Sequence, residues 1–76
     1  MNPEIEKIVG LNIRKLREKA KMTQDELSAK MQVEGCDVTR SALAKIEVGQ
    51  RHLYPNEIII IKKILKANYE DIFKMK

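Results

Sequence analysis

The chain has 76 residues, of which 43% are hydrophobic and 34% are charged, so one globular domain over residues 1–76 is expected and disorder is not. A net charge of +4 permits a polyanionic partner such as nucleic acid without proving one. The single cysteine excludes an internal disulfide and a multi-cysteine zinc site, and no apolar stretch is long enough to cross a membrane, so we expect a cytoplasmic protein without metal or cofactor.

The first expected element is a helix over residues 3–20. Asn2 is suited to cap its start. Val9 and Ile13 lie one turn apart and, with the apolar residues that follow, predict an inner stripe. Gly10 costs about 1 kcal/mol relative to alanine inside a helix, which predicts a close packing contact at that position.

Two short helices are expected next, over residues 23–33 and 39–47. Thr23 and Glu26 form a T-x-x-E capping box, in which each side chain satisfies a free backbone donor at the helix start. The later of the two helices also begins at a threonine, and Gly49 is suited to end it in a left-handed conformation.

The helix over residues 39–47 has two chemically different sides. Leu43 and Ile46 share the inner side, whereas Arg40, Ser41 and Lys45 lie on the opposite side. A short helix with an anchored apolar side and an outward polar side suits insertion into a DNA major groove. The alternative interpretation is an ordinary amphipathic helix with a solvated charged face.

The last two helices are expected over residues 56–66 and 68–74. The earlier one contains four consecutive isoleucines, which are also compatible with a buried strand. The helical interpretation is favoured because Ile58, Ile61 and Leu65 recur at i, i+3 and i+7. The remaining isoleucines widen the apolar arc beyond what one small core requires.

These features resemble the Cro/repressor-type helix-turn-helix family, also called the xenobiotic-response-element-like regulators. The resemblance rests on IRKLREKAKMTQDELSAKM, VTRSALAKIEVGQR and EIIIIKKILKANYEDIF, and it covers the chain from about Val9 to Phe73. It implies an all-α fold, a compact five-helix lambda-repressor-like domain whose second and third helices form the helix-turn-helix. The connection Gln32–Asp37 between those helices is longer than is usual in the family.

The resemblance also implies site residues for binding double-stranded DNA. Base reading is expected from Arg40, Ser41, Ala44 and Lys45. Phosphate contacts are expected from Gln24, Thr39, Arg51, His52 and Arg14. Gln24 is further expected to brace the first residue of the third helix, and an Arg17–Glu47 ion pair is expected to tie the first helix to the third. The alternatives are that the cations of the first helix form a solvated face and that His52 is a plain polar loop residue.

The expected function is that of a sequence-specific transcriptional regulator, a repressor, acting as a homodimer on an inverted-repeat operator. The expected dimer patch consists of Ile59, Ile60, Ile64 and Phe73, unless these residues simply complete the core. The alternative function is a protein-interaction module of antitoxin or anti-repressor type, which the long connection between the second and third helices supports. One histidine, one cysteine and no glycine-rich loop argue against an enzyme.

Overall fold

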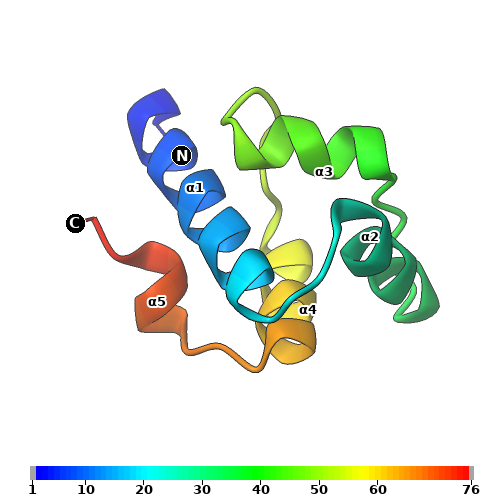
Figure 1. Ribbon diagram of the computed structural model, residues 1–76. Coiled ribbons are helices and arrows are strands. Elements are labelled where there is room, and N and C mark those ends of the chain that lie inside the picture. Colours follow the sequence, from blue (N-terminus) through cyan, green and yellow to red (C-terminus); the bar gives the residue numbers. More distant parts are fainter. Residues whose placement is uncertain (1, 76) are drawn as a thin grey trace.

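The computed structural model describes residues 2–75 and consists of five helices (Figure 1). They are α1 (Pro3–Lys19), α2 (Gln24–Val33), α3 (Arg40–Glu47), α4 (Pro55–Leu65) and α5 (Tyr69–Phe73). No strand occurs within the described range, and the consecutive isoleucines lie in α4, so the expected all-α five-helix fold is confirmed. Residues 1 and 76 of the expected domain lie outside the described residues.

Helices α2 and α3 begin and end where the sequence supplies the caps. Thr23 Oγ1 accepts the N–H of Glu26 at 3.1 Å, and the Glu26 carboxylate accepts the N–H of Thr23 at 2.8 Å. Thr39 accepts the N–H of Ala42 at 3.1 Å. Gly49 then ends α3 with a φ of 78°, which is a left-handed conformation that glycine adopts without strain.

One hydrophobic core joins all five helices. Its largest fully buried side chains are Val9, Ile13, Leu27, Met31, Val38, Leu43, Ile46, Ile61 and Ile72. Helix α1 packs against α3, α4 and α5, and α2 packs against α3 and α4. Among the described residues, no helix combines the length and the apolar character that a membrane span requires.

Helix α1 makes two close contacts that fix its neighbours. A side chain at Gly10 would overlap the carbonyl oxygen of Ile46, so the backbones of α1 and α3 touch here, as the helical glycine predicts. Asn12 Nδ2 donates to the carbonyl oxygens of Ile72 at 2.9 Å and Lys74 at 2.7 Å. These bonds satisfy free carbonyl groups at the end of α5 and hold that short helix against α1.

Candidate nucleic-acid interface

Helix α3 is anchored by one side and exposed on the other. Leu43 and Ile46 are buried in the core, in agreement with the amphipathic pattern. Of the four residues expected to read bases, Arg40, Ser41 and Lys45 are exposed and Ala44 is half-buried. Arg40, Ser41 and Lys45 are therefore accessible to a partner without any rearrangement of the core.

The first turns of α2 and α3 lie next to each other. Asp25 in the first turn of α2 lies 3.7 Å from the Nε of Arg40 in the first turn of α3. Both side chains are in solvent, with exposed fractions of 65% for Arg40 and 77% for Asp25. Because the first N–H groups of a helix have no intrahelical partner, this side of the molecule carries two sets of free donors that suit an anion.

A buried ion pair joins α1 to the last turn of α3. Arg17 Nε and Nη2 donate to the two carboxylate oxygens of Glu47 at 2.7 and 3.1 Å, the pairing that the family resemblance implies. Hydrogen bonding to Glu47 raises the pKa of Arg17 above its ordinary value. Arg17 Nη1 also donates to the carbonyl oxygen of Met22 at 2.8 Å, so one guanidinium connects three segments.

Gln24 completes this arrangement in a way that differs from the sequence-based expectation. Its Nε2 donates to Glu47 Oε1 at 3.0 Å, so Gln24 contacts the last residue of α3 and does not brace the first. Arg17 Nη2 donates to the same oxygen at 3.1 Å, so Gln24 and Arg17 share one acceptor. With these contacts, the end of α3 is held by both preceding helices.

A second ion pair, which the sequence analysis missed, joins the α3–α4 loop to the first turn of α4. Arg51 Nη1 and Nη2 donate to the two oxygens of Glu57, each at 2.9 Å, and Nη1 also donates to the carbonyl of His52 at 2.8 Å. The guanidinium lies over the ring of Tyr54, 5.6 Å from its centroid. Arg51 therefore ties the loop to the first turn of α4, and its contact with phosphate stays a prediction.

Glu57 is the anchor of that loop. Burial alone would raise the pKa of its carboxyl group. Hydrogen bonds from Arg51 and from the N–H of Tyr54, together with the charge of Arg51, outweigh burial, so the pKa of Glu57 is lower than usual. The charged form of Glu57 is thus the one that the fold stabilises.

His52 connects the same loop to the start of α1. Its Nδ1 lies 2.7 Å from a carboxylate oxygen of Glu6, which is buried although it is charged. The rest of the imidazole is exposed. The two partners are 46 residues apart in the sequence, and no local pattern indicates such a pair.

Two further residues that were expected to contact phosphate, Thr39 and Arg14, are exposed. Thr39 uses its hydroxyl oxygen as an acceptor for the α3 cap and keeps its own proton for donation. Arg14 lies on the exposed side of α1, 3.4 Å from Glu18 one turn later. Neither side chain is buried by its present partner.

The long α2–α3 connection is folded back against the core. Ser28 Oγ donates to the carbonyl of Val38 at 2.7 Å, and Gln32 Nε2 donates to the same oxygen at 3.3 Å. Gly35 provides the turn with a φ of 85°. Cys36 is buried, and burial raises the pKa of its thiol, which disfavours the thiolate and suits a core residue.

The residues expected to form a dimer patch are not equally exposed. Ile59 is 53% exposed and Phe73 is exposed, but Ile60 and Ile64 are half-buried and pack against the core. Ile59 and Ile64 also lie about 140° apart around the axis of α4. For two of the three isoleucines the alternative interpretation therefore applies, because they complete the core.

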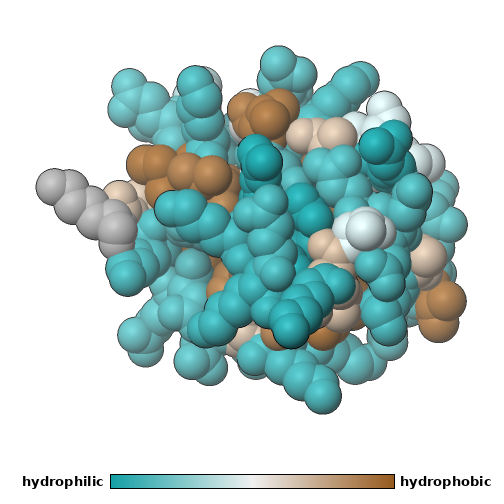
Figure 2. Space-filling model, in the orientation of Figure 1, coloured by the Kyte–Doolittle hydropathy of each residue, from teal (hydrophilic) through white to brown (hydrophobic). Residues whose placement is uncertain are grey.

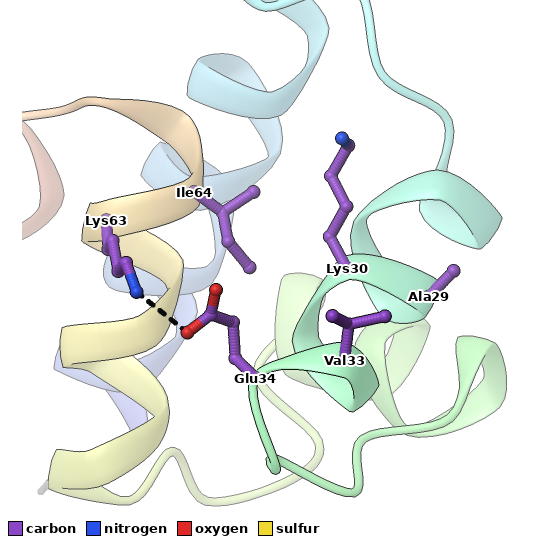
Figure 3. A pocket seen from close by; sticks show the side chains of 6 residues that line it. All are labelled: Ala29, Lys30, Val33, Glu34, Lys63 and Ile64. Carbon is purple, nitrogen blue, oxygen red and sulfur yellow. Dashed lines mark hydrogen bonds and ion pairs between the residues drawn. The ribbon is translucent and has the colours of Figure 1, made fainter.

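A shallow groove lies between α2 and α4 (Figure 3). It is lined by Ala29, Lys30, Val33, Glu34, Lys63 and Ile64. Lys63 Nζ donates to Glu34 at 2.8 Å and joins the two helices across the groove. Within residues 2–75, no group of three or more His, Cys, Asp or Glu side chains is placed to hold a metal ion.

Comparison with known proteins identifies the family. A family model described as helix-turn-helix matches residues 13–71, which is most of the chain and includes α2, α3 and α4. Neither a curated protein nor a solved structure gives a significant match. Together with the five-helix fold and the capped α2–α3 pair, the match shows that the chain belongs to the Cro/XRE-type helix-turn-helix family of DNA-binding transcription regulators.

Proposed function

We propose that the protein is a sequence-specific repressor that inserts α3 into the DNA major groove. The observation that carries this proposal is the contrast within α3 between its buried inner side and its exposed Arg40, Ser41 and Lys45. Repression needs only occupancy of a DNA site, and a chain of 76 residues is large enough to provide it. No second activity has to be assumed.

The exposed residues of α3 have the chemistry that base reading requires. Arg40 can donate two hydrogen bonds to the acceptors of one guanine, and Lys45 can donate to guanine as well. Ser41 can donate or accept, and Ala44 can contact a thymine methyl group. Phosphate contacts that position the protein are proposed for Gln24, Thr39, Arg51, His52 and Arg14.

A single short helix reads only a few base pairs, so we propose that two copies bind an inverted-repeat operator. Helix-turn-helix dimers place their recognition helices in successive major grooves about 34 Å apart. The symmetry of the protein pair then matches the symmetry of the DNA site.

Selection of bound duplexes from a random DNA pool tests this function. We expect one inverted repeat to be enriched and its affinity to fall steeply as salt is raised. Arg40→Ala should weaken binding by about 1–3 kcal/mol and relax one base position. Lys74→Ala removes the same charge outside the α2–α3 segment and serves as the control. Unselective binding by the wild type, or unchanged binding by Arg40→Ala, would reject the proposal.

The second candidate function is a protein-interaction module of antitoxin or anti-repressor type. The observation that favours it is Val33, which is 86% exposed at the end of α2 and lines the groove between α2 and α4. Such a module would bind DNA weakly and without sequence preference. The same selection experiment therefore separates the two functions.

A further inference from the structure

The loop after α3 contains a histidine that is held by a buried acid. His52 Nδ1 lies 2.7 Å from a carboxylate oxygen of Glu6, in the first turn of α1. Only 7% of the Glu6 side chain is exposed, whereas 70% of the His52 side chain is exposed. A buried charge requires a polar partner, and His52 supplies it. One edge of the imidazole is thus fixed by the protein, and the rest of the ring faces solvent.

The contact with Glu6 decides which nitrogen of His52 carries the proton. A carboxylate accepts hydrogen bonds and donates none, so Nδ1 is the donor. A neutral imidazole has one N–H group, which leaves Nε2 as an acceptor. A phosphate oxygen of DNA is also an acceptor, so the neutral ring has no proton to share with it. The protonated ring has an N–H group on both nitrogens and can bind Glu6 and a phosphate at once.

We propose that Glu6 positions His52 for a backbone phosphate of double-stranded DNA, and that this contact forms only when the imidazole is protonated. The inference rests on the proposed function, because DNA is the ligand, and it adds a role for Glu6 and a dependence on pH. Affinity for DNA should rise as the pH falls, since protonation supplies both the missing donor and a positive charge. Glu6 acts through His52 and does not itself touch the DNA.

The sequence makes this dependence on pH simple to assign. His52 is the one histidine of the chain. Imidazole is the only side chain that ordinarily changes its charge between about pH 5 and 8. The one thiol, Cys36, is buried with a raised pKa, which favours its neutral form in that range. A change of DNA affinity over this range can therefore be traced to His52 by a single substitution.

The other groups near His52 leave the contact with the ring to Glu6. Within residues 2–75, the further charged or titratable side chains that line or adjoin the hollow beside the ring are Lys7 on α1, Arg51 and Tyr54 in the loop, and Glu57 on α4. Two hydrogen bonds pair Arg51 with Glu57, which offsets the positive charge of Arg51. The backbone of Lys7 lies against Gly49, while its side chain lines another hollow.

That other hollow, between α1 and the end of α3, does not indicate a partner in the same way. Figure 2 shows hydrophobic surface over the first half of α1 and at the nearby end of α3. Charges of both signs border this surface, on Glu4, Lys7 and Arg14. Their arrangement favours no particular occupant, whereas the free Nε2–H of a protonated His52 calls for an anionic oxygen.

DNA binding at several pH values tests the inference. The probe is rhodamine-labelled duplex DNA of random sequence, followed by fluorescence anisotropy at constant ionic strength from about pH 8 to pH 6. The affinity of the wild type should rise about three- to fivefold as the pH falls. The slope of log K against log salt should become steeper by about 1, because one more phosphate is contacted. His52→Gln gains no proton, so its affinity should stay constant.

Glu6→Gln separates positioning from mere support of the fold. The amide of glutamine can donate to Nδ1, so the proton of the neutral ring can lie on Nε2. The neutral ring then donates to phosphate, and the variant should bind more tightly than the wild type at the upper pH and respond less to pH. A purely structural role predicts weaker binding instead. Glu4→Gln removes the same charge from an exposed position in the first turn of α1 and should keep the wild-type response.

The tautomer of His52 is measured without DNA, which keeps this inference separate from the proposed function. Nitrogen NMR shifts of the free wild type at the upper pH should show the proton on Nδ1. A proton on Nε2, affinity that does not change with pH, or a pH response that survives in His52→Gln would overturn the inference. Salt-dependent DNA binding without a pH response rejects this inference alone, whereas no DNA binding at any pH rejects the proposed function as well. Circular dichroism at each pH verifies that every variant is folded.

Discussion

The two sides of α3 differ in how firmly their charged residues are held. On the inner side, Glu47 accepts hydrogen bonds from Arg17 and Gln24 at 2.7 to 3.1 Å and is buried. On the outer side, Arg40 has one partner, Asp25, at 3.7 Å in solvent. The inner contacts fix the orientation of the helix, and the outer residues stay available for a ligand. Changes on the inner side should therefore affect stability, whereas changes on the outer side should affect binding.

The largest effect is expected from Glu47→Ala. This change leaves Arg17 buried without its carboxylate partner and should lower the free energy of unfolding by about 3–5 kcal/mol. Urea denaturation followed by circular dichroism measures it. The double variant Arg17→Met/Glu47→Leu replaces both charges by apolar groups and should recover most of the loss. A single variant as stable as the wild type would show that the pair does not hold α3.

A smaller loss is expected from Gly10→Ala, which tests the backbone contact between α1 and α3. The added methyl group overlaps the carbonyl oxygen of Ile46, and overpacking of this kind costs about 1–3 kcal/mol. Gly35→Ala is the control, because no atom lies within 4 Å of its added methyl group and only the left-handed backbone is strained. Thermal unfolding of both variants should rank Gly10→Ala as the less stable, and the reverse order would argue against a tight contact.

Helices α2 and α3 were largely predictable from local patterns. Capping threonines, the spacing of apolar residues and Gly49 each act within a few residues, so the sequence alone indicates where α2 and α3 begin and where α3 ends. The fold class follows from these elements, and the family resemblance adds the link between Arg17 and Glu47.

The contacts of the α3–α4 loop could not be predicted in this way. Arg51 was expected to contact phosphate, yet it is paired with Glu57, and His52 lies against Glu6. These pairs form only after the loop has packed on α1 and α4, and an unpaired cation and a paired one look the same in a sequence. The pattern of α4 set apart Ile58 and Ile61, which are buried, but it did not distinguish Ile59, which is exposed, from the half-buried Ile60 and Ile64.

Asp25→Asn tests the outer side of α3, because Asp25 is the partner of Arg40 there. The change frees Arg40 and removes a negative charge beside the proposed DNA surface, so affinity for random duplex DNA should rise about two- to fivefold. Fluorescence anisotropy at several salt concentrations measures it. Glu70→Gln is the control, because it removes one exposed negative charge on α5, outside the proposed DNA contacts. An equal rise in both variants would indicate a general charge effect.

The smallest effect concerns the pH dependence of the Arg51–Glu57 pair. Because the pKa of Glu57 is lower in the folded state than its ordinary value of 4.5, the pair stabilises the fold fully above that pH. This stabilisation is lost as the pH falls below 4.5 through the folded pKa. As the pH falls below 4.5, the free energy of unfolding should therefore decrease less for Glu57→Gln than for the wild type. The difference should be under about 1 kcal/mol, and urea denaturation at each pH measures it. Parallel pH profiles would contradict it.

The buried Cys36 gives the chain an internal reporter. It is the one thiol in the sequence, and it lies in the connection that leads into α3. A thiol reagent reaches Cys36 only when this connection opens. The labelling rate of the unaltered protein therefore reports how often the connection opens. Slower labelling in the presence of a ligand would then show directly that the ligand tightens the α2–α3 segment.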